Sequence, residues 1–155
     1  MRGYTLIELI IVLGIFAVLT GIATVNLLGF QRQTNITGLV DTFITNVKEQ
    51  QTKAMSGDTE GRGENSSYGV NIALTNYVLF HGTFTSGEQS NRIITLPAIA
   101  EITTTFPNAQ LIFEGGSGEL AGYASANATV TIRDTVSNDQ KTIYFNRYGV
   151  VTAIN

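Results

Sequence analysis

The sequence predicts an α+β protein, in which a long N-terminal helix is followed by an antiparallel, β-rich head domain. Two observations predict this class. Residues 5–56 are apolar or amphipathic at helical spacing, whereas the pattern after residue 67 has a period of two and is rich in strand-forming residues. No second helical segment separates the expected strands, so we expect one antiparallel sheet packed on the end of the helix.

The first half of the expected helix, residues 4–30, is apolar on all sides. Apart from Glu8, no charged residue occurs between Arg2 and Arg32. About 20 apolar residues are enough to span a bilayer. The run is longer than the core of an ordinary secretory signal, and no Ala-x-Ala pattern closes it. We therefore expect residues 4–30 to form a transmembrane helix, with a plain signal anchor as the alternative.

The second half, residues 31–56, is predicted to be an amphipathic continuation of the same helix. Polar residues such as Asp41 and Lys48 alternate with an apolar stripe at helical spacing. Such a stripe indicates a helix that docks one face on a sheet, and Gly57 is the expected C-terminal cap. The apolar stripe consists of Ile36, Leu39, Val40, Phe43, Val47, Ala54 and Met55.

Residues 57–155 are predicted to form the β-rich globular head. A polar loop over 57–67 precedes the strands, and hairpin signals occur at 74–76, 137–139 and 146–149. The expected strands are Tyr68–Ile72, Tyr77–His81, Arg92–Leu96, Ala100–Thr105, Ala109–Phe113, Ala128–Arg133, Lys141–Asn146 and Val150–Ile154.

Composition excludes several classes of function. The chain has no cysteine, so it has neither disulfides nor thiol chemistry. Acidic residues outnumber basic ones from Asp58 onward, which argues against a broad phosphate-binding face and makes nucleic acid an unlikely partner. The protein is not expected to be an enzyme.

No catalytic, cofactor or metal site is predicted. His81 is the single histidine and is expected to be a strand-end or surface residue, because a general base needs an oriented partner and a substrate site. The glycines at 115–118 have no helix after them, so they do not indicate a phosphate loop. Asp58, Glu60 and Glu64 do not have the spacing of an EF-hand, and a solvated loop is favoured over an ion site.

Glu8 is the most informative single residue, because a carboxylate in an apolar membrane helix is costly and usually has a defined partner. The obvious candidate is an α-amino group. Thr5-x-x-Glu8 is also a capping box, in which Glu8 would serve only the first helical turn. The two roles are compatible.

Gly3-Tyr4-Thr5-Leu6-Ile7-Glu8-Leu9-Ile10 resembles the processing motif of type IV pilins and pseudopilins. The resemblance implies that residues 1–3 are a leader peptide, that a prepilin peptidase cuts between Gly3 and Tyr4, and that Tyr4 is N-methylated. Residues 4–30 would then become the filament core, with Glu8 as the assembly residue. Tyr4 stands where the family most often has Phe, and Val25 stands where many relatives have proline.

The same resemblance implies the partners and the location. The partners would be the prepilin peptidase, other pilin or pseudopilin subunits, an inner-membrane assembly platform, and membrane lipid before assembly. The precursor would be a single-pass cytoplasmic membrane protein with Arg2 inside and the head outside. After assembly the subunit would belong to a type IV pilus or a type II secretion-like filament.

Two short patches of the head, Tyr68–Val70 with 77–80 and 143–146 with 149–151, are similar to the head of GspH/FimT-type minor pilins. Two alternatives remain. A DNA-binding minor pilin of a competence system would need a basic cluster, and a membrane-anchored binding domain that never polymerises would make Glu8 only a helix cap. The candidates for the basic cluster are Arg62, Arg92, Arg133 and Arg147.

Overall fold

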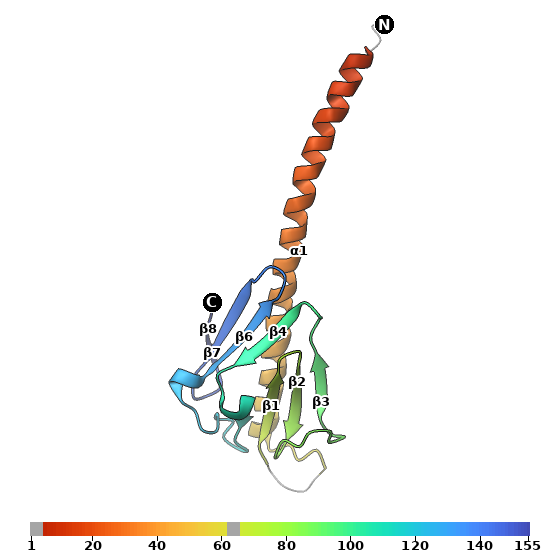
Figure 1. Cartoon of the computed structure of the whole chain (residues 1–155). Coiled ribbons are helices and arrows are strands. Elements are labelled where there is room, and N and C mark those ends of the chain that lie inside the picture. The colour runs from red at the N-terminus through yellow and green to blue at the C-terminus, as the bar shows by residue number, and fades with distance from the viewer. Residues whose placement is uncertain (1–4, 62–65) are drawn as a thin grey trace. The chain divides into compact units, whose positions relative to one another are not determined.

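The structure is a computed structural model that describes residues 5–61 and 66–155. For residues 22–35 it describes the helix but not the side chains. It has the expected α+β class. One long α-helix, α1 (Leu6–Ser56), is followed by eight strands and two short 3-10 turns (Figure 1). The chain divides into two compact units, Met1–Asn35 and Ile36–Asn155.

In the first unit, every described side chain from Thr5 to Gly21 is exposed. The exposed side chains include large apolar ones, with Phe16 at 69% and Leu6 at 76% of their full exposure. Within the described residues, no helix meets the combined length and hydropathy that a membrane crossing requires.

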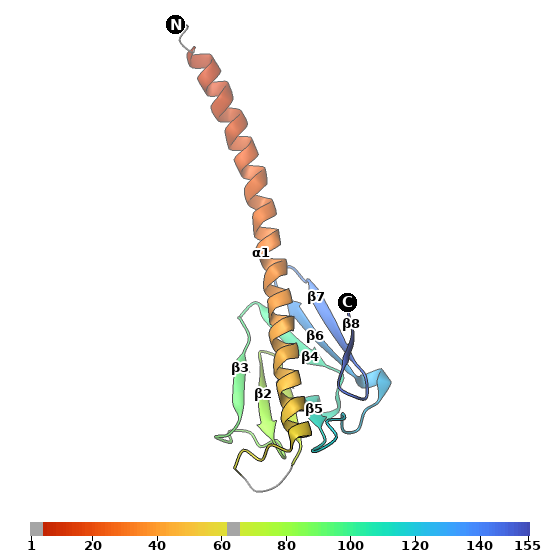
Figure 2. The ribbon, with the colours of Figure 1, turned by 180° about the vertical axis from the view of Figure 1, so that it is seen from behind.

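In the second unit, the later part of α1 packs on the strands through the predicted apolar stripe. Figure 2 shows this part of α1 lying over the strands. Phe43 is completely buried and Val47 is 1% exposed. The prediction is wrong for Met55, which is 57% exposed, because it lies in the last turn beside the loop at Gly118. The other stripe residues that are buried are Ile36, Val40 and Ala54, and Leu39 is partly buried.

α1 ends at Gly57, as its sequence predicts. Gly57 has φ of 64°, a left-handed conformation that glycine adopts without a steric penalty. The Gly57 N–H donates to the carbonyl of Ala54 at 3.3 Å, and the Asp58 N–H donates to the carbonyl of Lys53 at 3.1 Å. This pair of bonds is a Schellman motif, which satisfies two carbonyls of the last helical turn.

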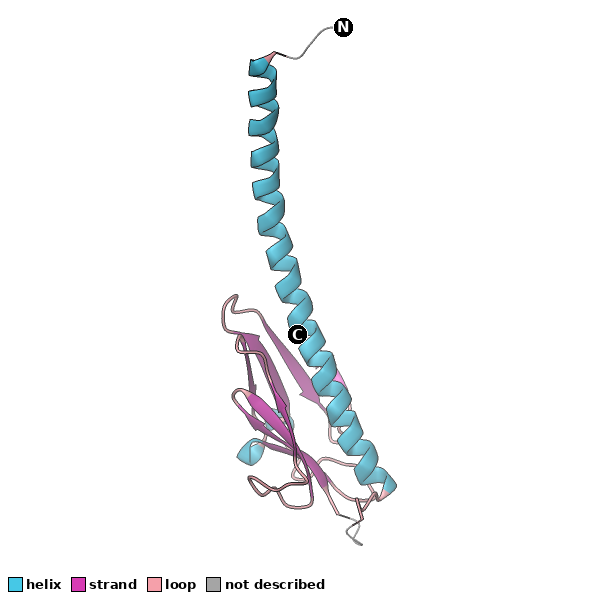
Figure 3. Ribbon diagram, turned by 90° about the vertical axis from the view of Figure 1, so that its right-hand side faces the viewer, coloured by secondary structure: helices cyan, strands magenta, loops and turns pink. Residues whose placement is uncertain are grey.

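The strands form two antiparallel four-stranded sheets, with orders β3-β2-β1-β5 and β4-β6-β7-β8. Figure 3 shows the strands in magenta beside the later part of α1. All eight strands lie where the sequence predicted them, to within one or two residues at each end. Their bounds are β1 Tyr68–Ala73, β2 Asn76–His81, β3 Arg92–Thr95, β4 Ala100–Thr104, β5 Gln110–Phe113, β6 Thr129–Asp134, β7 Gln140–Phe145 and β8 Val151–Ile154.

The division into two sheets differs from the single sheet that we expected. The chain leaves β3 through a turn at Pro97, where the Ala100 N–H donates to the Pro97 carbonyl at 2.9 Å. β4 then pairs with β6, far along the chain, instead of with β3. Hydrophobic periodicity defines each strand but carries no information about which distant strand becomes its neighbour, so the sequence left this pairing undetermined.

Both sheets and the later part of α1 contribute to one hydrophobic core. Phe43 of α1 meets Tyr77 of β2 edge to face, with ring centroids 5.1 Å apart. The second sheet contributes a row of side chains with no exposed surface, Val130 and Ile132 of β6 and Ile143 of β7 among them. Because this core excludes water, any polar group inside it needs a hydrogen-bond partner.

Candidate functional site

The N-terminal processing site and the start of α1 meet at residue 5. Gly3 and Tyr4 lie outside the described residues. Thr5 precedes the helix, and its N–H and its hydroxyl each donate to Glu8 Oε2 at 2.8 Å. The Glu8 N–H donates back to Thr5 Oγ1 at 3.4 Å. This geometry is the reciprocal capping box that the spacing predicted.

The capping box uses one oxygen of the Glu8 carboxylate, Oε2. Within the described residues its side-chain hydrogen bonds use Oε2, and the residue is exposed. A carboxylate has about four lone-pair directions on its two oxygens, so one cap does not exhaust it. The capping bonds therefore hold the Glu8 carboxylate at the helix start through Oε2.

The described arginines of the proposed basic cluster each contact a nearby acidic or amide side chain. Arg92 pairs with Glu49 at 2.7 Å, and Arg147 pairs with Glu119 at 2.8 Å. Arg133 donates to Asn138 at 2.6 Å and lies opposite Glu101 in the sheet register. Arg62 lies outside the described residues. Each described arginine thus has an acidic or amide neighbour, an arrangement that does not favour a phosphate-binding stripe.

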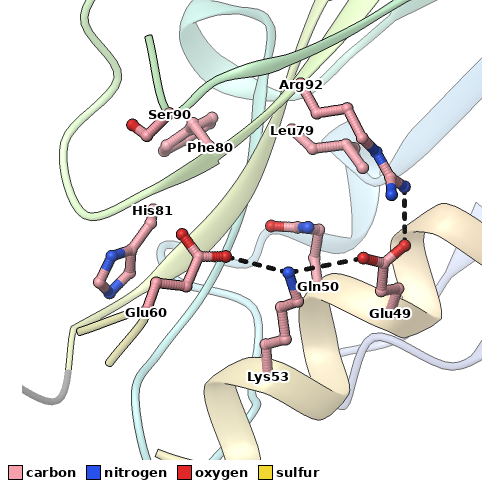
Figure 4. A pocket seen from close by; sticks show the side chains of 9 residues that line it. All are labelled: Glu49, Gln50, Lys53, Glu60, Leu79, Phe80, His81, Ser90 and Arg92. Carbon is pink, nitrogen blue, oxygen red and sulfur yellow. Dashed lines mark hydrogen bonds and ion pairs between the residues drawn. The ribbon is translucent and has the colours of Figure 1, made fainter. Parts of the chain in front are cut away.

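A solvent-open cavity of about 230 Å³ lies in the second unit between α1 and the strands β2 and β3 (Figure 4). It was not predicted from the sequence, because its residues come from segments up to 43 positions apart. They are Glu49, Gln50 and Lys53 of α1, Glu60 of the following loop, Leu79, Phe80 and His81 of β2, Ser90, and Arg92 of β3.

Four charged side chains form a chain of ion pairs across the cavity. Lys53 Nζ lies 3.0 Å from Glu60 and 3.5 Å from Glu49, and Glu49 also pairs with Arg92 (Figure 4). Partial burial acts to lower the pKa of Lys53, but the hydrogen bonds and charges of the two glutamates outweigh it, so the pKa is raised. The network contains two carboxylates and two cations, so its net charge is zero.

His81 is a strand-end residue, as predicted, but it is not a surface residue. It ends β2 and is only 5% exposed. Its ring stacks on Tyr68 with centroids 4.4 Å apart, and Nε2 shares a short hydrogen bond with the Ser66 hydroxyl. The signal that could have predicted the burial is the unbroken apolar run 77–80, which is typical of a strand buried on both faces, and every residue from Tyr77 to His81 is buried.

Two buried polar atoms at this cavity have no hydrogen-bond partner among the described residues. They are Nδ1 of His81 and Oε1 of Gln50, and the Gln50 side chain is 3% exposed. Such groups usually find a partner in protein or water. No group of three or more acidic, histidine or cysteine side chains able to hold a metal occurs within the described ranges.

The loop at 115–118 has a structural function. The Gln51 amide donates to the carbonyls of Gly118 at 3.0 Å and Tyr148 at 2.5 Å, so it ties two loops to the end of α1. A Cβ at Gly118 would come within 2.2 Å of Met55 Cγ. The glycine is needed for this close approach and for its φ of 68°.

Comparison with known proteins identifies the N-terminal segment. Residues 1–24 match the family model described as the prokaryotic N-terminal methylation motif. No curated protein and no solved structure matches the chain. The similarity of the head to GspH/FimT-type minor pilins therefore stays a prediction.

The motif match supports the type IV pilin and pseudopilin family that residues 3–10 resemble. The motif supports a pilin-like or pseudopilin subunit, and the family that carries this motif is structural and non-enzymatic. The motif implies processing by a prepilin peptidase and assembly with other pilins, and it suggests a membrane-anchored precursor.

Proposed function

We propose that this protein is a structural subunit of a type IV pilus or a type II secretion-like filament, and that it assembles through its N-terminal helix. The observation that carries the proposal is the methylation motif over residues 1–24, with Glu8 in the first turn of α1. The leader is residues 1–3, cleavage falls between Gly3 and Tyr4, and Tyr4 is N-methylated.

The assembly step moves the apolar N-terminal helix from lipid into a bundle of like helices. Residues 4–30 cross the cytoplasmic membrane before assembly and form the filament core afterwards. The exposed apolar side chains from Leu6 to Leu19 support this, because they have no cover within the described part of the unit. The head, residues 57–155, lies outside the cytoplasm, and residues 31–56 join it to the core.

Glu8 sets the register of the bundle by accepting the N-terminal ammonium of Tyr4 from an adjacent subunit. Burying two charges costs several kcal/mol per ion, and removing one member of a buried pair costs about 3–5 kcal/mol. The ammonium therefore disfavours every register in which it does not meet a carboxylate. The capping box supports this function, since it fixes the carboxylate at the helix start.

Processing is tested by mass spectrometry of the protein from cells with an active prepilin peptidase. We expect a chain that begins at Tyr4 and is one methyl group heavier than the unmodified form. Gly3→Val should block cleavage, since a side chain before the scissile bond would not fit the peptidase. A wild-type chain that keeps Met1 would contradict the proposal.

Assembly is tested by a set of three variants that separates the charge of Glu8 from its capping bonds. Glu8→Gln keeps the capping box but loses the charge, and Thr5→Val loses the capping hydroxyl but keeps the charge. Glu8→Ala loses both. We expect both Glu8 variants to be cleaved and inserted normally but to be strongly depleted from sheared filaments, with Thr5→Val near wild type.

If assembly depends on the capping bonds and not on the charge, Glu8 is a helix cap only. If Glu8→Gln assembles at wild-type levels while Thr5→Val and Glu8→Ala do not, the ammonium–carboxylate mechanism is wrong. Normal processing with no incorporation of even the wild-type chain would indicate an anchored domain that does not polymerise.

A further inference from the structure

The docked part of α1, residues 36–56, has one face that the sheets do not cover. In Figure 2 this part of α1 lies in front of the strands, so the side turned to the viewer is not the side packed on the sheets. Six exposed residues recur there at alternating intervals of three and four, which places them in one row along the helix. We call this row the outer face. It consists of Gly38, Asp41, Thr45, Lys48, Thr52 and Met55.

The outer face contains one acid and one base, and neither is paired within the described part of the chain. Asp41 and Lys48 are both exposed, and among the described residues the Asp41 carboxylate and the Lys48 ammonium have no hydrogen bond or ion pair. The other two charged residues of this segment, Glu49 and Lys53, pair with each other at 3.5 Å. The unpaired charges of the docked segment therefore both lie on the outer face.

The spacing of these two charges prevents them from meeting within one helix. Oppositely charged side chains pair along a helix at three or four residues, whereas Asp41 and Lys48 are seven residues apart. Seven residues are about two turns, or about 10 Å along the axis. A parallel second helix that is displaced by the same seven residues would bring its Lys48 level with Asp41 of the first.

The neighbours of the two charges permit a second helix to approach. A Cβ added to Gly38 would meet nothing within 4 Å, so the chain's own fold gives this glycine no steric reason. The Thr45 hydroxyl donates to the carbonyl of Asp41 at 2.8 Å, so it would lose no hydrogen bond if another helix covered it. Small side chains at a contact reduce the distance between two helix axes.

We propose that the outer face packs on the outer face of a second copy of this chain, parallel to the first and displaced by seven residues, with Asp41 of one copy paired with Lys48 of the next. The inference rests on the proposed function, because a filament gives each copy a like neighbour on two sides. Each copy then offers its acid to one neighbour and its base to the other, a contact that does not close into a dimer.

The charges favour this partner over a surface of one sign. An anionic lipid or nucleic acid would attract Lys48 and repel Asp41, whereas a second copy satisfies both. Covering either charge without its partner is costly, so displacements other than seven residues are disfavoured. The pair is thus a second determinant of the filament register, in the docked part of α1, in addition to Glu8.

Disulfide cross-linking tests the displacement. The chain has no cysteine, so introduced cysteines report on this face alone. The full chain carrying both Asp41→Cys and Lys48→Cys leaves no charge unpaired and should assemble. Mild oxidation of its sheared filaments should give a ladder of linked subunits, while each single variant stays largely monomeric. Thr42→Cys with Lys48→Cys is the matched control and should give few links, because Thr42 is exposed but lies about 100° around the helix from Asp41.

Charge reversal tests the pairing itself. Asp41→Lys places like charges together and should lower incorporation into filaments about tenfold or more. Adding Lys48→Asp to the same chain should restore most of it. Asp139→Lys, at an exposed position of the head, is the matched control and should assemble as the wild type does. All three variants should unfold at the wild-type urea concentration, since none removes a described contact of the side chain.

Several outcomes would overturn the proposal while leaving the proposed function intact. Cross-linking that stops at dimers in the double cysteine variant would indicate an antiparallel pair, and strong linking by Asp41→Cys alone would indicate helices without displacement. Filaments that form normally but show no ladder, or that tolerate Asp41→Lys, would show that the outer face makes no such contact. If the wild-type chain forms no filaments, this inference and the proposed function are both wrong.

Discussion

The two described ends of α1 are both rich in apolar side chains, but they differ in what surrounds those side chains. Between Thr5 and Gly21 every side chain is exposed, whereas between Ile36 and Ser56 the apolar stripe is buried against the sheets. Phe16 is 69% exposed and Phe43 is completely buried. The same residue type in the same helix therefore has two different environments.

The difference shows where the stabilisation of each part comes from. A buried phenylalanine contributes to folding through the apolar area it removes from water, by about 25 cal/mol per Å². An exposed one contributes nothing of this kind until another apolar phase covers it. In the docked part of α1 the sheets supply that cover, and we infer that lipid or neighbouring helices supply it for the N-terminal part.

The largest expected effect comes from a variant that tests the difference between the buried and the exposed part of α1. Phe43→Ala should lower the free energy of unfolding of the head by about 3–5 kcal/mol, because it leaves a cavity in the core. Phe16→Ala is the matched control and should leave head unfolding unchanged within about 0.5 kcal/mol. Urea unfolding of the full chain in micelles, followed by tyrosine fluorescence, measures both.

In the assembly assay we expect the reverse, with a larger effect for Phe16→Ala than for Phe43→Ala. If the N-terminal helix is the filament core, Phe16→Ala should reduce the amount of protein in sheared filaments although its head is stable. A head that unfolds equally easily in both variants would mean that residues 5–21 also contribute to the fold of the second unit, and the contrast would be lost.

The sequence predicted local structure better than it predicted the sites. All eight strands are confirmed because turn residues and a period of two mark each of them, as at Leu74–Asn76 between β1 and β2. The end of α1 is confirmed because glycine adopts the φ of 64° at Gly57 without a steric penalty. The N-terminal motif is local as well, since Thr5 and Glu8 are three residues apart.

What the sequence did not predict depends on long-range pairing. The pairing of β4 with β6 joins residues about thirty positions apart, and the cavity brings Gln50 beside His81. No local pattern indicates that such segments meet. The burial of His81 follows from the unbroken apolar run that precedes it in β2, but the lack of a partner for Nδ1 among the described residues becomes visible only when the surrounding side chains are in place.

Two carboxylates, one in a buried residue and one in an exposed residue, extend the comparison between the two regions. Asp134 Oδ1 accepts the N–H groups of Val136 at 2.7 Å and Ser137 at 3.0 Å, and its side chain is 2% exposed. Glu8 makes the same kind of backbone contact on an exposed helix start. Asp134→Ala should cost about 1–3 kcal/mol of head stability, since two N–H groups lose their charged acceptor.

Glu8→Ala is the counterpart and should leave head unfolding unchanged in the same urea experiment. Asp134→Asn keeps an oxygen acceptor and should recover most of the loss. If Asp134→Asn is as unstable as Asp134→Ala, the charge matters more than the two backbone bonds, and the comparison with a helix cap fails.

A smaller effect is expected in alkaline solution. Burial raises the pKa of Tyr77, whose hydroxyl accepts a hydrogen bond from Asn46 at 2.7 Å, and the pKa of Lys53 is raised as well. A group whose folded-state pKa is raised contributes stability that is complete below its unfolded pKa, about 10 for both groups, and is lost as the pH rises through the folded value. Head stability should therefore be level through neutral pH and fall above about pH 10.

Tyr77→Phe removes one of these two titrating groups, so the fall above pH 10 should be shallower than in the wild type. The variant also loses the Asn46 bond, so its stability at pH 7 should be lower by about 1 kcal/mol. Tyr148→Phe, which changes a side chain that is 60% exposed, serves as the control and should retain the wild-type slope. An unchanged slope in Tyr77→Phe would assign the alkaline loss to Lys53 alone.

The smallest expected effect concerns the ion pairs at the rim of the cavity. Lys53 contacts Glu49 and Glu60, but its side chain is 30% exposed, and pairs open to solvent contribute only about 0–1 kcal/mol. Lys53→Met keeps the aliphatic stem that lies over Tyr68, where Nζ is 5.8 Å from the ring centroid. Head stability should then fall by less than about 1 kcal/mol, and the difference from wild type should shrink further in 1 M salt, where charges are screened within about 3 Å. Lys48→Met, an exposed change on the same helix, is the control for the loss of one positive charge. If Lys53→Met instead lowers head stability by several kcal/mol, and salt does not change that loss, the ion pairs are shielded from solvent. The cavity would then have to be counted among the buried parts of the molecule.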